Sequence, residues 1–204
     1  MKPKKVSKIL LKRLTLYLDH LQSLPDDVTY VSATSIAKAL DLGDVQVRKD
    51  LARVSGGGKC KIGHMRDRLI RDLDNYLNFG DTTNAIVIGA GKLGKALLDY
   101  QGFEPVGINL VAGFDIRPEK DLYRNTKPIY AADDLEDFCA IHYIKIAILA
   151  VPEEAAQEMC DRLVDCGIRA IWNFTPVHLI APDYIAIQNE NLAISLAALR
   201  MQLK

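Results

Sequence analysis

A glycine-rich turn between an apolar run and a helical pattern constrains the fold of this chain more than any other feature. The run Ala85-Ile-Val-Ile88 is short and continuously apolar, as in a strand buried on both faces. It leads directly into Gly89-x-Gly91-x-x-Gly94 and then into helical spacing. In such a turn the first glycine permits a tight bend. The second lets a pyrophosphate approach the backbone, and the third lets the helix pack close to the strand.

An acidic residue stands where this motif requires one. Asp115 ends a second apolar run, 108–114, about 20 residues beyond the glycines, where a ribose-binding carboxylate is expected. The motif therefore predicts dinucleotide binding, with phosphates at the N-terminus of the helix. An acid at 115 favours NAD over NADP, although Arg117 could accommodate a 2′-phosphate. A crossover whose glycines serve only the turn is the alternative.

The remainder of this half alternates between strand and helix patterns. Strands are predicted at 84–88, 108–115, 144–150, 170–173 and 184–188, and helices at 91–100, 132–142 and 153–166. This order predicts an α/β Rossmann domain over 84–190, a parallel sheet with helices on both faces. Ligands bind such sheets outside the carboxyl ends of the strands. The residues predicted there are Gly89, Ala90, Gly91, Lys92, Leu93, Gly94, Asp115, Ile116, Val151, Pro152, Asn173, Phe174, Thr175 and Pro176.

Charge divides the chain although the whole is neutral. Residues 1–83 carry 15 Lys and Arg against 10 Asp and no Glu, whereas 84–204 carry 11 Lys and Arg against 16 Asp and Glu. Within 48–71, eight basic residues stand against two acidic ones. A basic first part joined to an acidic second part predicts two units with different partners, the first a polyanion.

The basic part has the pattern of a helix-turn-helix. A helix is predicted over Ser7–Leu24, and a second over Ala33–Leu40 with Ser32 as N-cap. After the break at 41–43, a third helix runs from Val45 to about Val54 with Asp44 as its cap. Residues 30–31 fit a strand or an extended entry. Together with a further helix over 65–77, these elements form a DNA-binding domain over 1–80, followed by a linker.

The third helix carries side chains suited to nucleic acid. Val47 and Leu51 share one face, which leaves polar and basic residues free to reach base edges or phosphates. A glycine-rich turn at 55–58 with two following lysines is typical of a β-wing. The predicted DNA-binding residues are Ser32, Gln46, Arg48, Lys49, Arg53, Lys59 and Lys61. A solvated basic helix beside a flexible loop is the alternative. Arg66, Arg68 and Arg71 are expected on a solvated face.

Several classes of function are disfavoured. About 110 residues follow Gly94 and the sheet consumes them, so a dehydrogenase would have no substrate domain. Its acid or base would be His142, His178 or Lys145, none with an obvious orienting group, and no catalytic residue is predicted. The four cysteines lack CxxC spacing, which predicts free cytosolic thiols and no metal site. No secretory signal is visible, and no apolar run reaches roughly 18 residues, so no membrane span is expected.

The order of these parts resembles the bacterial redox-sensing transcriptional repressor Rex family over almost the whole chain. The matching stretches are Arg13-Leu-x-x-Tyr17-Leu18, Val45-Gln-Val-Arg-Lys-Asp-Leu51, Gly89-x-Gly91-x-Leu93-Gly94, Gly113-Phe-Asp115, Val151-Pro-x-x-x-Ala156-Gln157 and Gly167-Ile-x-Ala-Ile-x-Asn173-Phe-x-Pro176-Val. The resemblance implies a winged-helix domain, a Rossmann domain that binds NAD(H), and a homodimer that exchanges the C-terminal helix, here 191–204. It implies a cytoplasmic repressor whose operator DNA is released when NADH binds, while NAD⁺ competes without causing release. It also places Tyr100 near the nicotinamide.

Two departures from the family pattern concern contacts. The wing lacks the usual aromatic residues, and His64 stands where a tyrosine is common. Asn191 replaces an aspartate that would pair with Arg13 of the first helix as a latch between subunits, so Glu190 could serve instead. An NAD-dependent dehydrogenase and a nucleotide- or CoA-binding module without DNA activity remain the alternatives.

Overall fold

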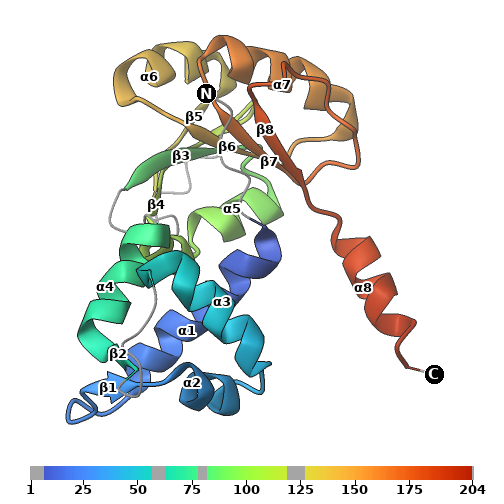
Figure 1. The fold of residues 1–204 in the computed structure, drawn as a ribbon. Coiled ribbons are helices and arrows are strands. Elements are labelled where there is room, and N and C mark those ends of the chain that lie inside the picture. The colour runs from blue at the N-terminus through green and yellow to red at the C-terminus, as the bar shows by residue number, and fades with distance from the viewer. Residues whose placement is uncertain (1–6, 57–62, 78–81, 119–126, 204) are drawn as a thin grey trace. The chain divides into compact units, whose positions relative to one another are not determined.

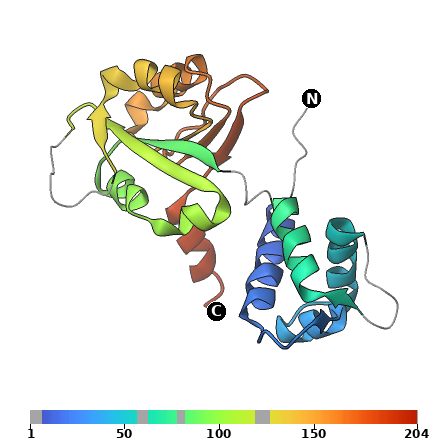
Figure 2. The same cartoon turned by 90° about the vertical axis from the view of Figure 1, so that its left-hand side faces the viewer.

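The computed structural model describes residues 7–56, 63–77, 82–118 and 127–203. The chain forms two compact units, 1–81 and 82–204, and each is considered by itself (Figures 1 and 2). Among the described residues, no helix is both long and apolar enough to cross a membrane.

The first unit is helical, with one small two-stranded sheet. Its elements are α1 (Lys8–Ser23), β1 (Tyr30–Val31), α2 (Ala33–Ala39), α3 (Asp44–Ser55), β2 (His64–Met65) and α4 (Arg66–Leu77). Helix α1 packs beside α4, and α2 beside α3. Strands β1 and β2 pair antiparallel, with Val31 opposite His64. Helices α2 and α3 with the turn between them form the predicted helix-turn-helix, and residues 57–62 of the predicted wing lie outside the described residues.

Apolar residues at helical spacing hold this unit together. Leu14, Tyr17 and Leu21 of α1 are fully buried and share a cluster with Val47 and Leu51 of α3. Ser32 caps α2 in a reciprocal capping box with Ser35, which satisfies two backbone N–H groups. The predicted cap of α3 is corrected by one residue, because Gly43 is the N-cap and Asp44 begins the helix.

The second unit contains a six-stranded sheet. Its elements are β3 (Thr83–Ile88), α5 (Lys92–Leu98), η1 (Gln101–Val106), β4 (Ile108–Asp115), β5 (Ile129–Ala131), η2 (Ala132–Asp134), α6 (Leu135–His142), β6 (Ile146–Leu149), η3 (Glu153–Ala155), α7 (Ala156–Asp165), β7 (Ala170–Asn173), β8 (Ala186–Asn189) and α8 (Leu192–Arg200). All described pairings are parallel, in the order β5-β4-β3-β6-β7-β8. This is the strand order of a dinucleotide-binding Rossmann sheet. The chain adds strands outward from β3 on one side, and then outward from β6 on the other, so the switch point lies between β3 and β6.

Alternate residues of the central strand face two different layers. Ile86 and Ile88 belong to a large cluster with residues of α6 and α7, whereas Ala85 and Val87 pack with Leu98 at the end of α5. Figure 1 shows α6 and α7 on one face of the sheet and α5 on the other. Because both faces are covered, β3 is apolar throughout its buried length.

Strand register brings four strand ends to one edge of the sheet. Ile88 pairs with Phe114 of β4 and with Leu149 of β6, and Leu149 pairs with Asn173 of β7. The segments after these strands are therefore neighbours at the switch point between β3 and β6. This edge is where the sequence predicts the ligand pocket.

Candidate functional site

The first glycine of the motif makes the tight turn out of β3. Gly89 has φ +90°, and an added Cβ would overlap the carbonyl oxygen of Ala150, so other residues would be strained there. Its N–H donates to the carbonyl oxygen of Phe114 at 2.8 Å. The turn is thus fixed to both neighbouring strand ends.

The other two glycines do different things. Gly94 is buried in α5, and a Cβ there would overlap the carbonyl oxygen of Gly89, so this glycine allows the helix to pack against the turn. Gly91 is the N-cap of α5, and a Cβ there would meet nothing within 4 Å. The second glycine therefore borders open space, as expected where a phosphate approaches the backbone.

Asp115 lies directly beside the glycine turn. Its Oδ2 accepts a hydrogen bond from the Ala90 N–H at 2.8 Å, and its Oδ1 accepts from the Arg117 N–H at 2.9 Å. An ionised carboxylate accepts more than two hydrogen bonds, so this one retains acceptor capacity for the hydroxyls of a ribose. Ile116 is 82% exposed next to it. The predicted acid and the glycines therefore form one site.

A small cavity lies on the other side of the switch point. Its volume is about 160 Å³, and its lining residues are Leu93, Phe174, Thr175, Pro176, Glu190, Asn191 and Leu192. They come from the start of α5 and from the segments after β7 and β8. The predicted residues Leu93, Phe174, Thr175 and Pro176 are thus brought together. Val151 also contacts this edge, because its side chain lies 3.1 Å from a Cβ added at Gly89.

Asn173 shapes this cavity from beneath. Its side chain is fully buried, and its amide donates to the carbonyl oxygen of Val177 and to Oδ1 of Asn189, each at 2.9 Å. Its Oδ1 accepts from the N–H and the hydroxyl of Thr175. These hydrogen bonds show that Asn173 holds the turn after β7 in place, and its predicted contact with the ligand stays a prediction.

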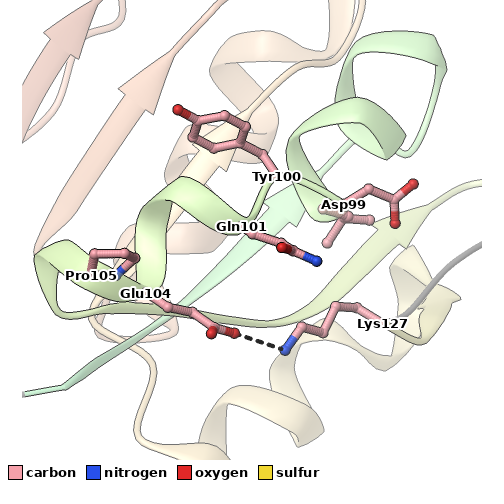
Figure 3. A pocket seen from close by; sticks show the side chains of 7 residues that line it. Asp99, Tyr100, Gln101, Glu104, Pro105 and Lys127 are labelled. Atoms are coloured by element: carbon pink, nitrogen blue, oxygen red, sulfur yellow. Dashed lines mark ion pairs between the residues drawn. The ribbon is translucent and has the colours of Figure 1, made fainter.

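Tyr100 lies apart from the glycine turn in this chain. It follows α5, whose seven residues span about 10 Å, and its ring packs edge-on against Phe103 with centroids 4.9 Å apart. It lines a different cavity of about 380 Å³ with Leu98, Asp99, Gln101, Glu104, Pro105 and Lys127. Figure 3 shows its ring pointing away from the Glu104–Lys127 ion pair. Nearness of Tyr100 to the nicotinamide stays a prediction.

In the first unit, the predicted DNA-contacting side chains of α3 lie on an exposed surface. Gln46, Arg48, Lys49 and Arg53 are exposed, whereas Val47 and Leu51 are fully buried. The Arg48 guanidinium donates to Asp44 Oδ2 at 2.7 Å and to the Thr34 hydroxyl at 3.0 Å, so it is oriented from α2. Ser32 is exposed at the start of α2. Lys59 and Lys61 lie outside the described residues.

Asp50 is a buried charged residue that the sequence analysis missed. It is 4% exposed on α3, and its carboxylate accepts from Arg13 Nε at 2.6 Å and from the Tyr17 hydroxyl at 3.0 Å. The structure therefore gives Arg13 a partner within its own unit. Asn191 is instead the N-cap of α8 and accepts from the Ile194 N–H at 3.0 Å. The latch between subunits stays a prediction.

One further residue of this unit, Arg66, differs from its predicted environment. Arg66 has a side chain only 13% exposed, and it donates to the carbonyl oxygens of Leu24 and Pro25 and to Asp26. Arg66 therefore links the start of α4 to the segment after α1, and it is not on a solvated face. His64, the first residue of β2, is half-buried with its Nδ1 3.3 Å from the Ser55 hydroxyl. Burial lowers the pKa of this imidazole.

No metal centre is found in the part of the chain that the structure describes, because no three His, Cys, Asp or Glu side chains cluster there. The described cysteines, Cys139, Cys160 and Cys166, are free thiols. Burial is the main cause that raises their pKa values, that of Cys139 to about 12. A raised pKa keeps a thiol protonated, so these cysteines suit the core of the sheet better than thiolate chemistry.

Fold and site together define a class: a winged helix-turn-helix unit joined to a Rossmann unit with a dinucleotide-type glycine turn. Residues 5–52 match a family model described as a putative DNA-binding protein N-terminus, and residues 81–177 match one described as a CoA binding domain. A redox-sensing transcriptional repressor Rex of Porphyromonas gingivalis is 36% identical over 202 residues, 98% of this chain and 93% of the relative. The chain therefore belongs to the Rex family of transcriptional repressors.

Solved structures agree with this assignment. A crystal structure of RSP in complex with β-NAD⁺ and operator DNA is 36% identical, covering 97% of this chain and 92% of that one, with a TM-score of 0.87. RSP in complex with β-NADH is 35% identical, covering 98% and 95%, with a TM-score of 0.81. RSP is described as a Rex-family repressor. Relatives of this kind are repressors, so the chain is a regulator and not a dehydrogenase.

Proposed function

We propose that this chain is a cytoplasmic repressor that binds operator DNA as a homodimer and releases it when NADH binds. One observation carries the proposal: Asp115 and the glycine turn form a single preorganised site, in a chain of a family with NADH-bound and DNA-bound members. Helix α3 presents the DNA-reading residues, and Lys59 and Lys61 add phosphate contacts. NAD⁺ competes for the same site without causing release.

The proposed ligand spans the switch point of the sheet. Its adenosine ribose binds Asp115, its pyrophosphate lies over Gly91, and its nicotinamide enters the cavity near Phe174 and Leu192. The oxidised ring is cationic and the reduced ring is neutral. A cavity lined by both apolar and polar side chains, with one carboxylate at Glu190, can distinguish the two rings by charge. Tyr100 is proposed to lie on the nicotinamide side and to help distinguish the two rings.

Release of DNA requires two dimer geometries with different affinities. NADH must bind one geometry better than the other, and that difference alone limits the shift in DNA affinity. The exchanged helix proposed for the dimer is α8, none of whose residues is buried in the single chain. The Arg13–Asn191 latch, or one through Glu190, would be an additional contact between subunits.

Titration of labelled DNA tests this function. The full-length protein is bound to a duplex that it has itself enriched from random DNA, and fluorescence anisotropy follows added NADH or NAD⁺. We expect NADH to release the DNA and NAD⁺ to raise the NADH concentration needed. Asp115→Ala should abolish the NADH response while the DNA affinity remains. Glu158→Ala, on the exposed side of α7, is the matched control. DNA binding indifferent to NADH would refute sensing.

CoA binding is the second candidate, because the model matching 81–177 is described as a CoA binding domain. Asp115 argues against it: a carboxylate beside the ribose repels the 3′-phosphate that CoA carries and a free ribose lacks. Competition distinguishes the two. CoA that displaces NADH at equal concentration would favour the CoA-binding module, whereas NADH retained against excess CoA supports the sensor.

A further inference from the structure

The carboxylate of Asp50 joins α1 to the exposed face of the DNA-reading helix. Four hydrogen bonds end on it: two from the Arg13 guanidinium at 2.6 and 3.1 Å, one from the Tyr17 hydroxyl at 3.0 Å, and one from Gln46 Nε2 at 2.8 Å. Tyr17 is fully buried, and the Asp50 side chain is 5% exposed. Gln46, four residues earlier on α3, is exposed. The network therefore runs from the core of the unit to its surface.

Because Asp50 is ionised, each of its neighbours must donate a hydrogen bond to it. Burial alone would raise the pKa of this carboxyl, but hydrogen bonds from Arg13, Gln46 and Tyr17 outweigh it and lower the pKa. A carboxylate only accepts hydrogen bonds, so every neighbour must turn a donor towards it. The Gln46 amide therefore faces Asp50 with its NH₂ group. Its carbonyl oxygen and second N–H remain for other partners.

We propose that Asp50 is a positioning residue that presets Gln46 to read adenine in the major groove. This rests on the proposed function of α3 as the DNA-reading helix. A glutamine amide that offers one acceptor and one donor matches the N6–H donor and N7 acceptor of adenine. Fixing the amide before binding avoids both the wrong orientation and part of the ordering cost. Arg13 and Tyr17 act through Asp50 and touch no DNA in this role.

Arg48 provides a contrast on the same helix. Its partner Asp44 has a side chain 40% exposed, and Arg48 itself is 63% exposed. Such a surface pair is weak, so Arg48 can leave it for a phosphate or a base. Gln46 is instead held by Asp50, whose carboxylate is buried and accepts four hydrogen bonds. Base preference should therefore depend on Asp50 more than on Asp44.

Selection from random duplexes tests whether Gln46 reads adenine. The full-length wild type should enrich a site with adenine at one position of each half-site, preferred roughly 5- to 150-fold over other bases. Gln46→Ala should remove that preference alone. Lys49→Ala is the control, because loss of a phosphate contact should weaken all sequences equally. An unchanged adenine preference in Gln46→Ala would overturn the proposal.

Asp50→Asn tests the positioning role itself. Asparagine can donate or accept, so the Gln46 amide gains both orientations, and the adenine preference should fall to within about twofold of the other bases. In the Gln46→Ala background Asp50→Asn should change base preference no further, which a merely structural role of Asp50 would not predict. A preference equal to wild type in folded Asp50→Asn would overturn the proposal.

A fold check and a milder variant complete the experiment. Cooperative thermal unfolding reports whether Asp50→Asn is folded. If it is not, Tyr17→Phe decides, because it removes one anchor and leaves the Arg13 ion pair: a reduced adenine preference supports positioning, and a wild-type preference overturns it. A wild type that enriches no DNA sequence would instead refute the proposed function, which separates the two failures.

Discussion

The Arg13–Asp50 pair makes the stability of the first unit depend on one buried charge. In Arg13→Met the carboxylate would remain buried with only neutral donors, so we expect unfolding at neutral pH to become easier by about 3–5 kcal/mol. Urea denaturation of wild type and variant measures this. Lys12→Met, one position earlier on an exposed site, is the control and should change little.

The pH dependence of that difference identifies its cause. The folded pKa of Asp50 lies below its ordinary value of 3.8, so its contribution is present above that value and is lost as the pH falls through the folded pKa. The penalty in Arg13→Met should therefore shrink in acid, where a protonated Asp50 needs no counter-charge. A penalty that is the same in acid as at neutral pH would mean that packing of the arginine stem is responsible.

Substitutions of single glycines in the turn can separate an effect on NADH binding from an effect on helix packing. Gly91→Ala places a methyl group in open space, so stability should remain within about 0.5 kcal/mol while NADH affinity falls, because the methyl group occupies the approach to the phosphates. Gly94→Ala would push against Gly89 and should lower both. Thermal unfolding and NADH fluorescence measure the two effects. A Gly91→Ala protein with wild-type NADH affinity would contradict the phosphate role.

Residue-scale prediction from sequence succeeded where chemistry is local. The glycine motif and Asp115 could be identified because their spacing along the chain fixes their meeting at the ends of two adjacent strands. Asp50 could not be, since a lone aspartate in a basic helix reads as a solvated charge. Its burial depends on Arg13, 37 residues away. The same holds for Arg66, whose partners lie about 40 residues earlier.

At the scale of elements, long apolar strands were predictable and short peripheral ones were not. Strands β3, β4, β6 and β7 have apolar runs that are buried on both faces, and each lies within one or two residues of its predicted bounds. Strand β5 has three residues and pairs only with β4, so tertiary pairing defines it. Strand β8 begins at Ala186, two residues later than predicted, and the 3₁₀ turn η1 was not predicted.

Helix α8 is an apolar helix with no buried residue in the single chain. Leu192, Leu196 and Leu199 share one side while Ile194 and Met201 lie on the other, and all are more than half exposed. A helix that is apolar all round is normally buried. Because apolar side chains occupy opposite sides of α8, a partner chain that contacts the helix on several sides would cover it best.

Charge placed on α8 should dissociate the proposed dimer. Leu196→Glu removes an apolar contact and requires burial of a carboxylate in both copies, so the dimer dissociation constant should rise at least about a hundredfold. Sedimentation equilibrium measures this. Gln202→Glu adds the same charge at an exposed polar position and is the control. An unchanged dissociation constant for Leu196→Glu would exclude α8 from the interface.

At the scale of the whole molecule, the two units have separate tasks and opposite charge. The basic unit is proposed to bind DNA, and the acidic unit to bind the dinucleotide at the glycine turn and Asp115. The proposed sites for NADH and for DNA therefore belong to different units. Any effect of one ligand on the other must pass through a change of the dimer between two states.

Such coupling must be reciprocal, which gives a test that needs no structure of either state. If NADH weakens DNA binding by a given factor, typically about 5- to 150-fold, saturating operator DNA must weaken NADH binding by the same factor. Two titrations suffice: DNA anisotropy with and without NADH, and NADH fluorescence with and without operator. A scrambled duplex is the control and should leave NADH affinity unchanged. Unequal factors would show that a third equilibrium, such as dimer dissociation, takes part.

Dimer dissociation would make the coupling factors depend on protein concentration. The Leu196→Glu protein should then lose that dependence on protein concentration.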